Sequence, residues 1–312
     1  MFNRHRLRIS LRVLMLLILL LGIWLGWRVN KARAQREAVA AVRKFGGWVH
    51  YDYEFKNGPV SVPRGHAIWK PCWGTLSPGK SPSAPVWLRR MLGDEYFQEI
   101  AHVSLFVDIV KGQAHAEPYN IGTADDVLDK LASQKGIRTL QIGGQQATNR
   151  GMAYVNSMTG LEELIIFPAN DISDEGVAHL TDLRNLRVLF ITNSQVTDAG
   201  LRHLSRLRSV EHLTLEGMGF SDQGLAYLSE MNRLKSLSLW NGVPGITDIG
   251  LASLGGLKDL ELLELGGCKV TDHGLEQLRS LTKLRELSLD GSLITQDGRN
   301  RLQASMPGLK IH

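Results

Sequence analysis

The sequence has very little cysteine, with 2 residues among 312, so a disulfide framework cannot hold this chain together. It also lacks a nucleophile elbow, a phosphate-binding loop, a dinucleotide fingerprint and a spaced Cys/His zinc pattern. The sequence therefore gives no support for an enzyme, a cofactor, a metal site or a small-molecule substrate. Hydrophobic residues make up 43% and charged residues 21%, which excludes wholesale disorder and a polytopic membrane protein.

Net positive charge is confined to the first part of the chain. Residues 1–44 hold ten Lys or Arg and one acid, Glu37, whereas the remainder holds 26 basic and 30 acidic residues. The formal net charge of +5 therefore hides a basic leader on a mildly acidic body. This distribution argues against a nucleic-acid partner and places the positive charge beside a membrane.

The leader contains a run of fifteen residues without charge, from Val13 to Trp27, between Arg12 and Arg28. Counted from Leu11 to Val29, a helix of this length spans about 28 Å, close to the ~30 Å of a hydrocarbon core. The two arginines can extend outward to the headgroups, where tryptophan rings also favour the interface. The sequence predicts one transmembrane anchor within residues 1–30.

A cleaved signal peptide is the alternative interpretation of the leader, because Ala32-Arg33-Ala34 matches an A-x-A cleavage pattern. We favour a signal anchor, since the apolar run is long and Arg28, Lys31 and Arg33 crowd the cleavage region. Basic residues are nearly balanced on the two sides of the run. A short N-terminal tail usually stays cytoplasmic, so we expect a single-pass protein with its body on the outer, periplasmic face.

The second half of the chain repeats itself with a period near 24 residues. Within one copy, Leu189 and Ile191 alternate as in a short strand, and Leu201, Leu204 and Leu207 have the spacing of one helical stripe. Neither element can bury its apolar face alone, so the copies must stack. The predicted fold is an α/β solenoid with parallel strands on the concave face and helices on the convex face. Copies begin at Ile137, Leu161, Leu186, Val210, Leu234, Leu260 and Leu284.

Hydroxyl residues followed by aspartates stand between each strand and helix. We expect the hydroxyl to cap the helix and the carboxylate to favour its positive end, rather than to bind metal or act in catalysis. The pairs are Ser173-Asp174, Thr197-Asp198, Ser221-Asp222, Thr247-Asp248 and Thr271-Asp272. Cys268, at the repeat position that takes Asn or Cys, is interpreted as a packing residue, with a bond to Cys72 as a less favoured alternative.

The motif L-x-x-L-x-L with its T-D-x-G-L turn resembles the cysteine-containing type of leucine-rich repeat, over residues 137–312. That type occurs in F-box substrate receptors and in many bacterial proteins. Nearly the whole chain, through SLRVLMLLILLLGIWLGW and WLRRMLGDEYFQEIAHVSL, is similar to membrane-anchored leucine-rich-repeat proteins of planctomycete bacteria. The resemblance implies an anchored interaction protein. No F-box-like helical segment precedes the repeats.

Residues 31–99 are predicted to form a juxtamembrane and capping region. A helix over 38–44 ends at Gly46-Gly47, and a half-buried strand covers 48–55, where His50, Asp52 and Glu54 share a face that we interpret as solvated rather than metal-binding. Six of the ten prolines fall in 59–85 and indicate loops. A helix over 85–96 is expected to close the open end of the solenoid. Residues 100–312 form the repeat domain, with a divergent first copy: a strand at 102–107, a helix at 123–132 and an insertion around 111–121.

The concave strand positions are candidate binding residues, because the repeat register places their side chains on one surface. Exposed aromatic residues on a rigid sheet are typical anchors for a partner. The candidates are Ile165, Phe167, Val188, Phe190, His212 and Trp240. The extra residues in WNGVPGI, next to Trp240, are expected to bulge from one edge. An alternative is that the 111–121 insertion or the proline-rich loop covers the apolar group within the same chain.

These observations favour a non-enzymatic, membrane-anchored protein that binds a protein or peptide through its concave face. Two other functions stay open at this point. One is a cytoplasmic substrate-recognition adaptor similar to the F-box receptors, and the other is a structural cell-envelope protein without a specific ligand.

Overall fold

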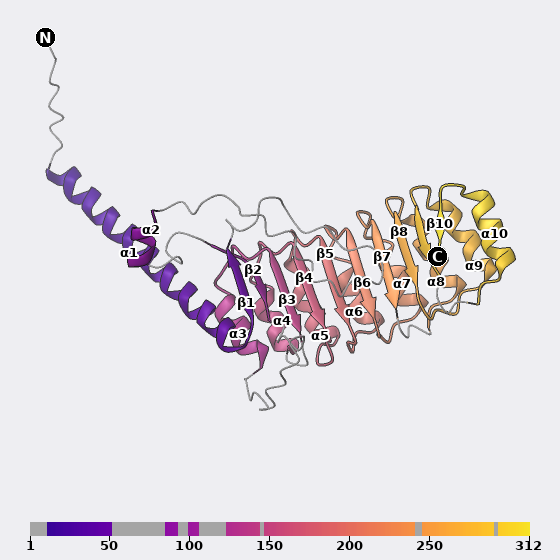
Figure 1. Cartoon of the computed structure of the whole chain (residues 1–312), viewed down its shortest axis with the longest axis horizontal. Coiled ribbons are helices and arrows are strands. Elements are labelled where there is room, and N and C mark those ends of the chain that lie inside the picture. Colours follow the sequence, from indigo (N-terminus) through magenta and orange to yellow (C-terminus); the bar gives the residue numbers. More distant parts are fainter. Residues whose placement is uncertain are drawn as a thin grey trace, which may run out of the picture.

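The computed structural model describes residues 11–51, 85–92, 99–105, 123–143, 147–240, 245–289 and 293–312. Within them, ten strands form a single sheet whose order follows the chain from β1 to β10 (Figure 1). β1 pairs antiparallel with β2, and every later neighbour is parallel. The strands are β1 (Trp48–Tyr51), β2 (Ile100–Ser104), β3 (Thr139–Gly143), β4 (Glu163–Phe167), β5 (Val188–Thr192), β6 (His212–Glu216), β7 (Ser236–Trp240), β8 (Leu262–Leu265), β9 (Glu286–Ser288) and β10 (Lys310–Ile311).

Helices cover one side of this sheet (Figure 1). Several of them tighten into a 3-10 turn at their C-terminal end, as in η5 (His179–Asp182), η6 (Leu254–Gly256) and η7 (Leu278–Ser280). The predicted solenoid is confirmed, with strands and helices in one layer each. The repeat helices are α3 (Ala124–Leu131), α4 (Asn149–Val155), α5 (Asp174–Ala178), α6 (Asp198–Leu204), α7 (Asp222–Leu228), α8 (Asp248–Ser253), α9 (Asp272–Gln277) and α10 (Gln296–Ser305).

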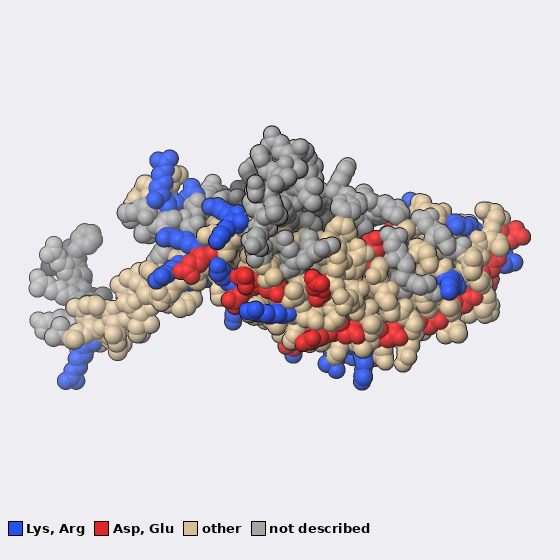
Figure 2. Space-filling view, turned by 90° about the horizontal axis from the view of Figure 1, so that it is seen from below, with Lys and Arg blue, Asp and Glu red and all other residues tan. Residues whose placement is uncertain are grey.

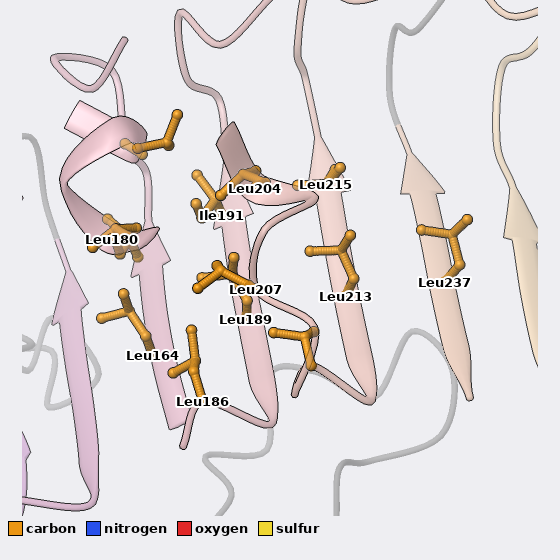
Figure 3. Close-up of a cluster of buried hydrophobic side chains, with 14 of the residues drawn as sticks. Leu164, Leu180, Leu186, Leu189, Ile191, Leu204, Leu207, Leu213, Leu215 and Leu237 are labelled. Carbon is orange, nitrogen blue, oxygen red and sulfur yellow. The ribbon is translucent and has the colours of Figure 1, made fainter. Parts of the chain in front are cut away.

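The core lies between the two layers, where leucine and isoleucine side chains of successive repeats stack on one another (Figure 3). Leu164, Leu189, Leu213 and Leu237 lie in register on β4 to β7 and are almost fully buried. Because each such side chain contributes about 1.5–3 kcal/mol when buried, stacking supplies the stability that an isolated repeat lacks. All seven residues at which the copies begin are buried, so the predicted register is correct.

The capping residues also form hydrogen bonds between successive repeats, which the sequence did not predict. Ser221 is the N-cap of α7, and its hydroxyl accepts from the backbone N–H of Gln223. The same hydroxyl donates to Asp198 Oδ2 of the preceding repeat, and the Ser221 backbone N–H donates to Asp198 Oδ1, both at 2.7 Å. Each aspartate therefore ties its own helix to the next repeat, in addition to lying at a positive helix end.

This aspartate ladder runs along most of the solenoid. One step differs, because Asn149 replaces the aspartate and its amide donates to the Ser173 hydroxyl, which leaves Ser173 without a hydrogen bond to its own helix. Figure 2 shows a row of acidic side chains along the solenoid. The aspartate steps join Asp125 to Thr148, Asp174 to Thr197, Asp198 to Ser221, Asp222 to Thr247, Asp248 to Thr271 and Asp272 to Thr295.

The ladder explains the glycine in the T-D-x-G motif. A Cβ placed on Gly224 would lie 2.2 Å from Asp198 Oδ1, and one on Gly250 would lie 2.3 Å from Asp222 Oδ1. The glycines of the other repeats meet the preceding Asp or Asn oxygen at similar distances. Only a residue without a side chain allows the carboxylate to approach this closely.

The N-terminal end of the solenoid is closed by α1 (Leu11–Lys44) together with β1. α1 is one continuous helix of 34 residues, about 50 Å long, whose first half projects away from the repeats (Figure 1). Its second half buries Ala38, Val39 and Val42 in the same core as α3. Gly46, with φ of 84°, then turns the chain into β1.

Several predictions for the middle of the chain need correction. The helix expected over 85–96 to close the solenoid is described as α2 (Val86–Leu92), with residues 93–96 outside the described part of the chain. Its Val86 and Trp87 are exposed, while α1 and β1 cover the end of the core. The strand predicted over 48–55 is described as far as Tyr51. Asp52, Glu54 and the 59–84 and 111–121 segments lie outside the described residues. Cys268 is buried and unbonded, as expected of a packing residue, and Cys72 lies outside the described residues.

Candidate binding surface

The surface opposite the helices, here called the concave face, is built from alternate strand residues. Strand pairing sets these side chains in rows that cross the sheet. One row runs through Thr139, Glu163, Val188, His212, Ser236, Leu262 and Glu286, and the next through Gln141, Ile165, Phe190, Thr214, Ser238, Glu264 and Ser288. The strand positions predicted to share one surface therefore do so, and the leucines that alternate with them point into the core.

The apolar group predicted on β4 and β5 is brought together by the structure. Ile165 is directly opposite Phe190, and the rings of Phe167 and Phe190 are 6.5 Å apart and tilted by 52°. This geometry is typical of a favourable aromatic pair. Ile165, Phe167 and Val188 are half-buried, whereas Phe190 is only 9% exposed. Phe190 thus lies at the floor of the group and its neighbours form the accessible rim.

Trp240 lies two strands away and is fixed in position by β8 (Leu262–Leu265). Its indole Nε1 donates to Glu264 Oε2 at 3.1 Å, and the same oxygen accepts from the Ser238 hydroxyl. A Cβ on Gly266 would lie 2.3 Å from Trp240 Cε3, so the ring packs directly against the Gly266 backbone. The polar edge of the indole is satisfied within the protein, and a half-buried aromatic surface is held without rotamer freedom.

Glu163 is the most unusual polar residue of this face. It is 3% exposed, and its Oε2 is buried without a hydrogen-bond partner. Burial raises the pKa of the Glu163 carboxyl to about 7. An ionised carboxylate in such a place lacks both water and a counter-charge, which makes its ionisation costly.

The histidines in the same row do not provide that counter-charge near neutral pH. Burial, followed by the charge of His50, lowers the pKa of His102 to about 4. Burial also lowers the pKa of His212, which is half-buried two strands from Glu163 on the other side. The basic residues that directly precede the neighbouring strands β3 and β5, Arg138 and Arg187, form ion pairs with Glu162 and Glu211 along the edge of the sheet.

Sequence reasoning placed Glu163 and Glu264 on this face without singling them out, and it missed Gly266. Glu163 and Glu264 fall in polar columns that a sequence cannot separate into satisfied and unsatisfied carboxylates. Gly266 stands just beyond β8, where only the close approach of Trp240 reveals its role. His212 and Trp240 were placed correctly on the face. His212 is directly opposite Val188 of the apolar group, whereas Trp240 is separated from that group by β6.

Metal binding finds no support in the described part of the chain, where no group of three or more His, Cys, Asp or Glu side chains is arranged to hold an ion. The loop of residues 241–244 beside Trp240 lies outside that part. One described helix, counted from Arg12 to Lys44, is long and apolar enough to cross a membrane, with a mean hydropathy of 2.0 in its most apolar window. Figure 2 shows its uncharged stretch standing clear of the body.

No protein-family model and no curated protein matches the chain. Solved structures that resemble it include two internalins of Listeria monocytogenes, InlC2 and InlF, each 19% identical. For InlC2 the TM-score is 0.47, with 68% of this chain and 80% of that chain covered. For InlF the TM-score is 0.43, with 59% and 56% covered.

A third similar structure is the leucine-rich-repeat ectodomain of the Arabidopsis thaliana receptor kinase GASSHO1/SCHENGEN3, solved with CASPARIAN STRIP INTEGRITY FACTOR 2. It is 16% identical with a TM-score of 0.35, and 53% of this chain and 20% of that chain are covered. The chain thus spans about half of InlF and a fifth of the plant ectodomain. The assignment of this chain as a leucine-rich-repeat solenoid rests on its own repeats, sheet and core.

Proposed function

We propose that this chain is a non-enzymatic, membrane-anchored leucine-rich-repeat protein that binds a protein or peptide through its concave face. The observation that carries the proposal is the pre-organised aromatic surface of that face. Trp240 is locked by Glu264 and Gly266, and the Phe167 ring packs on Phe190 beside Ile165. Rigid, partly accessible aromatic groups bind partners at a low entropic cost.

The anchor is proposed from the exposed apolar half of α1. Its large side chains from Val13 to Val29 are more than 40% exposed, which would be unfavourable in water. The guanidinium of Arg28 lies 5.7 Å from the Trp24 ring, and the Lys31 ammonium is the same distance from the Trp27 ring. Such pairs suit the headgroup region of a bilayer.

Membrane fractionation tests the anchor. The full chain should sediment with membranes and resist carbonate extraction. Cleavage after Ala34 would give a soluble species beginning at Gln35, and its recovery would exclude the anchor. We place the repeats on the outer face, and a reporter fused after His312 tests this orientation. A cytoplasmic reporter signal would favour the adaptor function instead.

Site-specific photocrosslinking tests binding at the concave face. A photoreactive benzoyl-phenylalanine is placed at Phe167 on the concave face or, as a matched control, at Tyr227 on α7, which is also half-buried but lies among the helices. In the native cells, Phe167 should give a discrete crosslinked species that Tyr227 does not give. Identical patterns from both positions, or no species from Phe167, would refute concave binding and favour a structural envelope protein.

A substitution in the patch provides a second test. Phe190→Asp places a charge at a position that is 9% exposed, so it should lower the melting temperature by several degrees. If this face binds a partner, the crosslink from Phe167 should also disappear at a temperature where the variant is still folded. Loss of stability with an unchanged crosslink would reject this patch and leave the Trp240 side as the candidate surface.

A further inference from the structure

The concave face carries charge of one sign. Between β3 and β9, its described positions include Glu163, Glu216, Glu264 and Glu286 and contain no Lys or Arg. The basic residues of these repeats lie on the helices or at the edge of the sheet instead; at the edge, Arg187 and Lys235 both pair with Glu211 at 2.9 and 2.7 Å. A partner that covers this face therefore meets carboxylates and apolar groups.

The carboxylates differ in what they can still bind. Glu264 is committed within the protein, because its Oε2 accepts from Ser238 and Trp240. Glu163 has a buried Oε2 without a partner, directly between Thr139 and Val188 in its row. An unsatisfied buried oxygen costs free energy that a donor from outside the chain would recover.

The surroundings of Glu163 define the donor that fits. Ile165 is two residues further along the same strand, and Val188 is opposite; both are half-buried, so aliphatic groups lie beside the buried carboxylate on these two sides. A lysine or arginine has an apolar stem that suits these groups and a charged donor at its tip. A neutral side chain would leave the negative charge uncompensated, and an acidic one would be repelled.

We propose that the concave face binds a basic, apolar peptide segment, with a lysine or arginine side chain reaching Glu163 and flanking apolar residues packing on Ile165, Val188 and the Phe167–Phe190 pair. This inference rests on the proposed function and specifies the chemistry of its partner. Trp240, with its Nε1 already bonded, supplies a second aromatic contact further along the sheet.

The test uses the full chain in detergent micelles and three capped pentapeptides, Gly-Phe-X-Phe-Gly, in which X is lysine, norleucine or glutamate. Norleucine keeps the lysine stem and removes the ammonium group. At about pH 8 the Glu163 carboxyl is mostly ionised, and calorimetry should show the lysine peptide binding at least about tenfold more tightly than the norleucine peptide. The glutamate peptide should bind most weakly.

Two changes should reduce the preference for the lysine peptide over the norleucine peptide. Glu163→Gln keeps the shape of the side chain and removes its charge, so the preference should fall below about twofold. The matched control is Glu162→Gln, whose carboxylate is at the edge and 4.0 Å from Arg138, and it should retain the preference. In the unmodified protein, lowering the pH to about 5.5 should also reduce the preference, because Glu163 then carries its proton.

Equal binding of the lysine and norleucine peptides, or a preference that survives in Glu163→Gln, would overturn the proposal. Binding by none of the peptides would also overturn it. Equal binding would leave concave recognition of an apolar segment standing. The crosslinking experiment decides that broader function independently, since it requires no assumption about the charge of the partner.

Discussion

The contact between Gly224 and Asp198 allows a sharp test of how successive repeats are joined. An alanine Cβ at position 224 would lie 2.2 Å from Asp198 Oδ1, so the carboxylate must move. It would then lose the Ser221 backbone N–H and the Ser221 hydroxyl, both now at 2.7 Å. The substitution therefore removes two hydrogen bonds to a charged acceptor, and it also brings the new Cβ to 3.0 Å from Cδ1 of the buried Leu201, which must shift slightly.

The expected magnitude combines two opposing effects. Each hydrogen bond to a charged group contributes about 1.5–3 kcal/mol when buried, and we take about 1 kcal/mol each because these groups are only partly buried. Alanine in place of glycine inside a helix favours folding by up to about 1 kcal/mol. Gly224→Ala should therefore lower the free energy of unfolding by about 1–2 kcal/mol.

The Asp198→Ala background should remove most of this effect. Without the carboxylate the shortest contact is gone, and the helix preference of alanine, up to about 1 kcal/mol, opposes the remaining 3.0 Å approach to Leu201 Cδ1, so Gly224→Ala should be close to neutral. Denaturant unfolding followed by circular dichroism gives the four stabilities of this cycle. Gly219→Ala is the control in the same repeat, because a Cβ there meets nothing within 4 Å. An equal destabilisation by Gly224→Ala in both backgrounds would refute the role of the ladder.

Two further predictions concern the concave face. Gly266→Ala should displace the Trp240 ring, change the near-ultraviolet circular dichroism and lower the melting temperature, whereas Gly256→Ala, whose Cβ would meet only Ser229 O at 3.9 Å, should change neither. Burial raises the pKa of Glu163 to about 7, above the usual ~4.3 of an unfolded chain, so its contribution to stability is present below about pH 4 and is lost as the pH rises through 7. Glu163→Gln should abolish this loss and be more stable than the parent at about pH 8, by a few kcal/mol at most; a variant with the parent's pH dependence would contradict the assignment.

The repeat architecture could be predicted because the spacing of apolar residues within each repeat indicates a strand followed by a helix. The alternation of Leu189 and Ile191 recurs in every copy, and the three-residue apolar spacing of Leu201, Leu204 and Leu207 recurs in all copies but the last, so local pattern and global fold agree. The capping residues could also be predicted from the sequence. Their hydrogen bonds to the preceding repeat could not, because Asp198 and Ser221 are separated by 23 residues and meet only when the repeats stack.

The end of the solenoid was predicted less well, for a related reason. A capping element is defined by the core that it covers, and both α1 and the 85–96 segment carry apolar residues. The sequence of α1 is dominated by its apolar run, which obscures the spacing of Ala32, Gln35, Ala38, Val39 and Val42 on one buried face. The unsatisfied Oε2 of Glu163 had no sequence signal at all, since burial at that column depends on the neighbouring strands.

The continuity of α1 has a consequence for the proposed partner. The helix that would cross the membrane is the same rigid element that packs on α3, and an ion pair between Lys31 and Glu99 adds a second link to β2. No flexible linker separates the apolar half of α1 from the cap within this helix, so the anchor fixes the orientation of the solenoid relative to the bilayer. The concave face then samples a narrow layer above the membrane rather than a sphere around a tether. A basic segment held in that layer, next to the membrane or on a neighbouring membrane protein, would gain a high effective concentration toward Glu163. A freely diffusing peptide gains none, and the weak affinity expected for the short pentapeptides follows from the same argument.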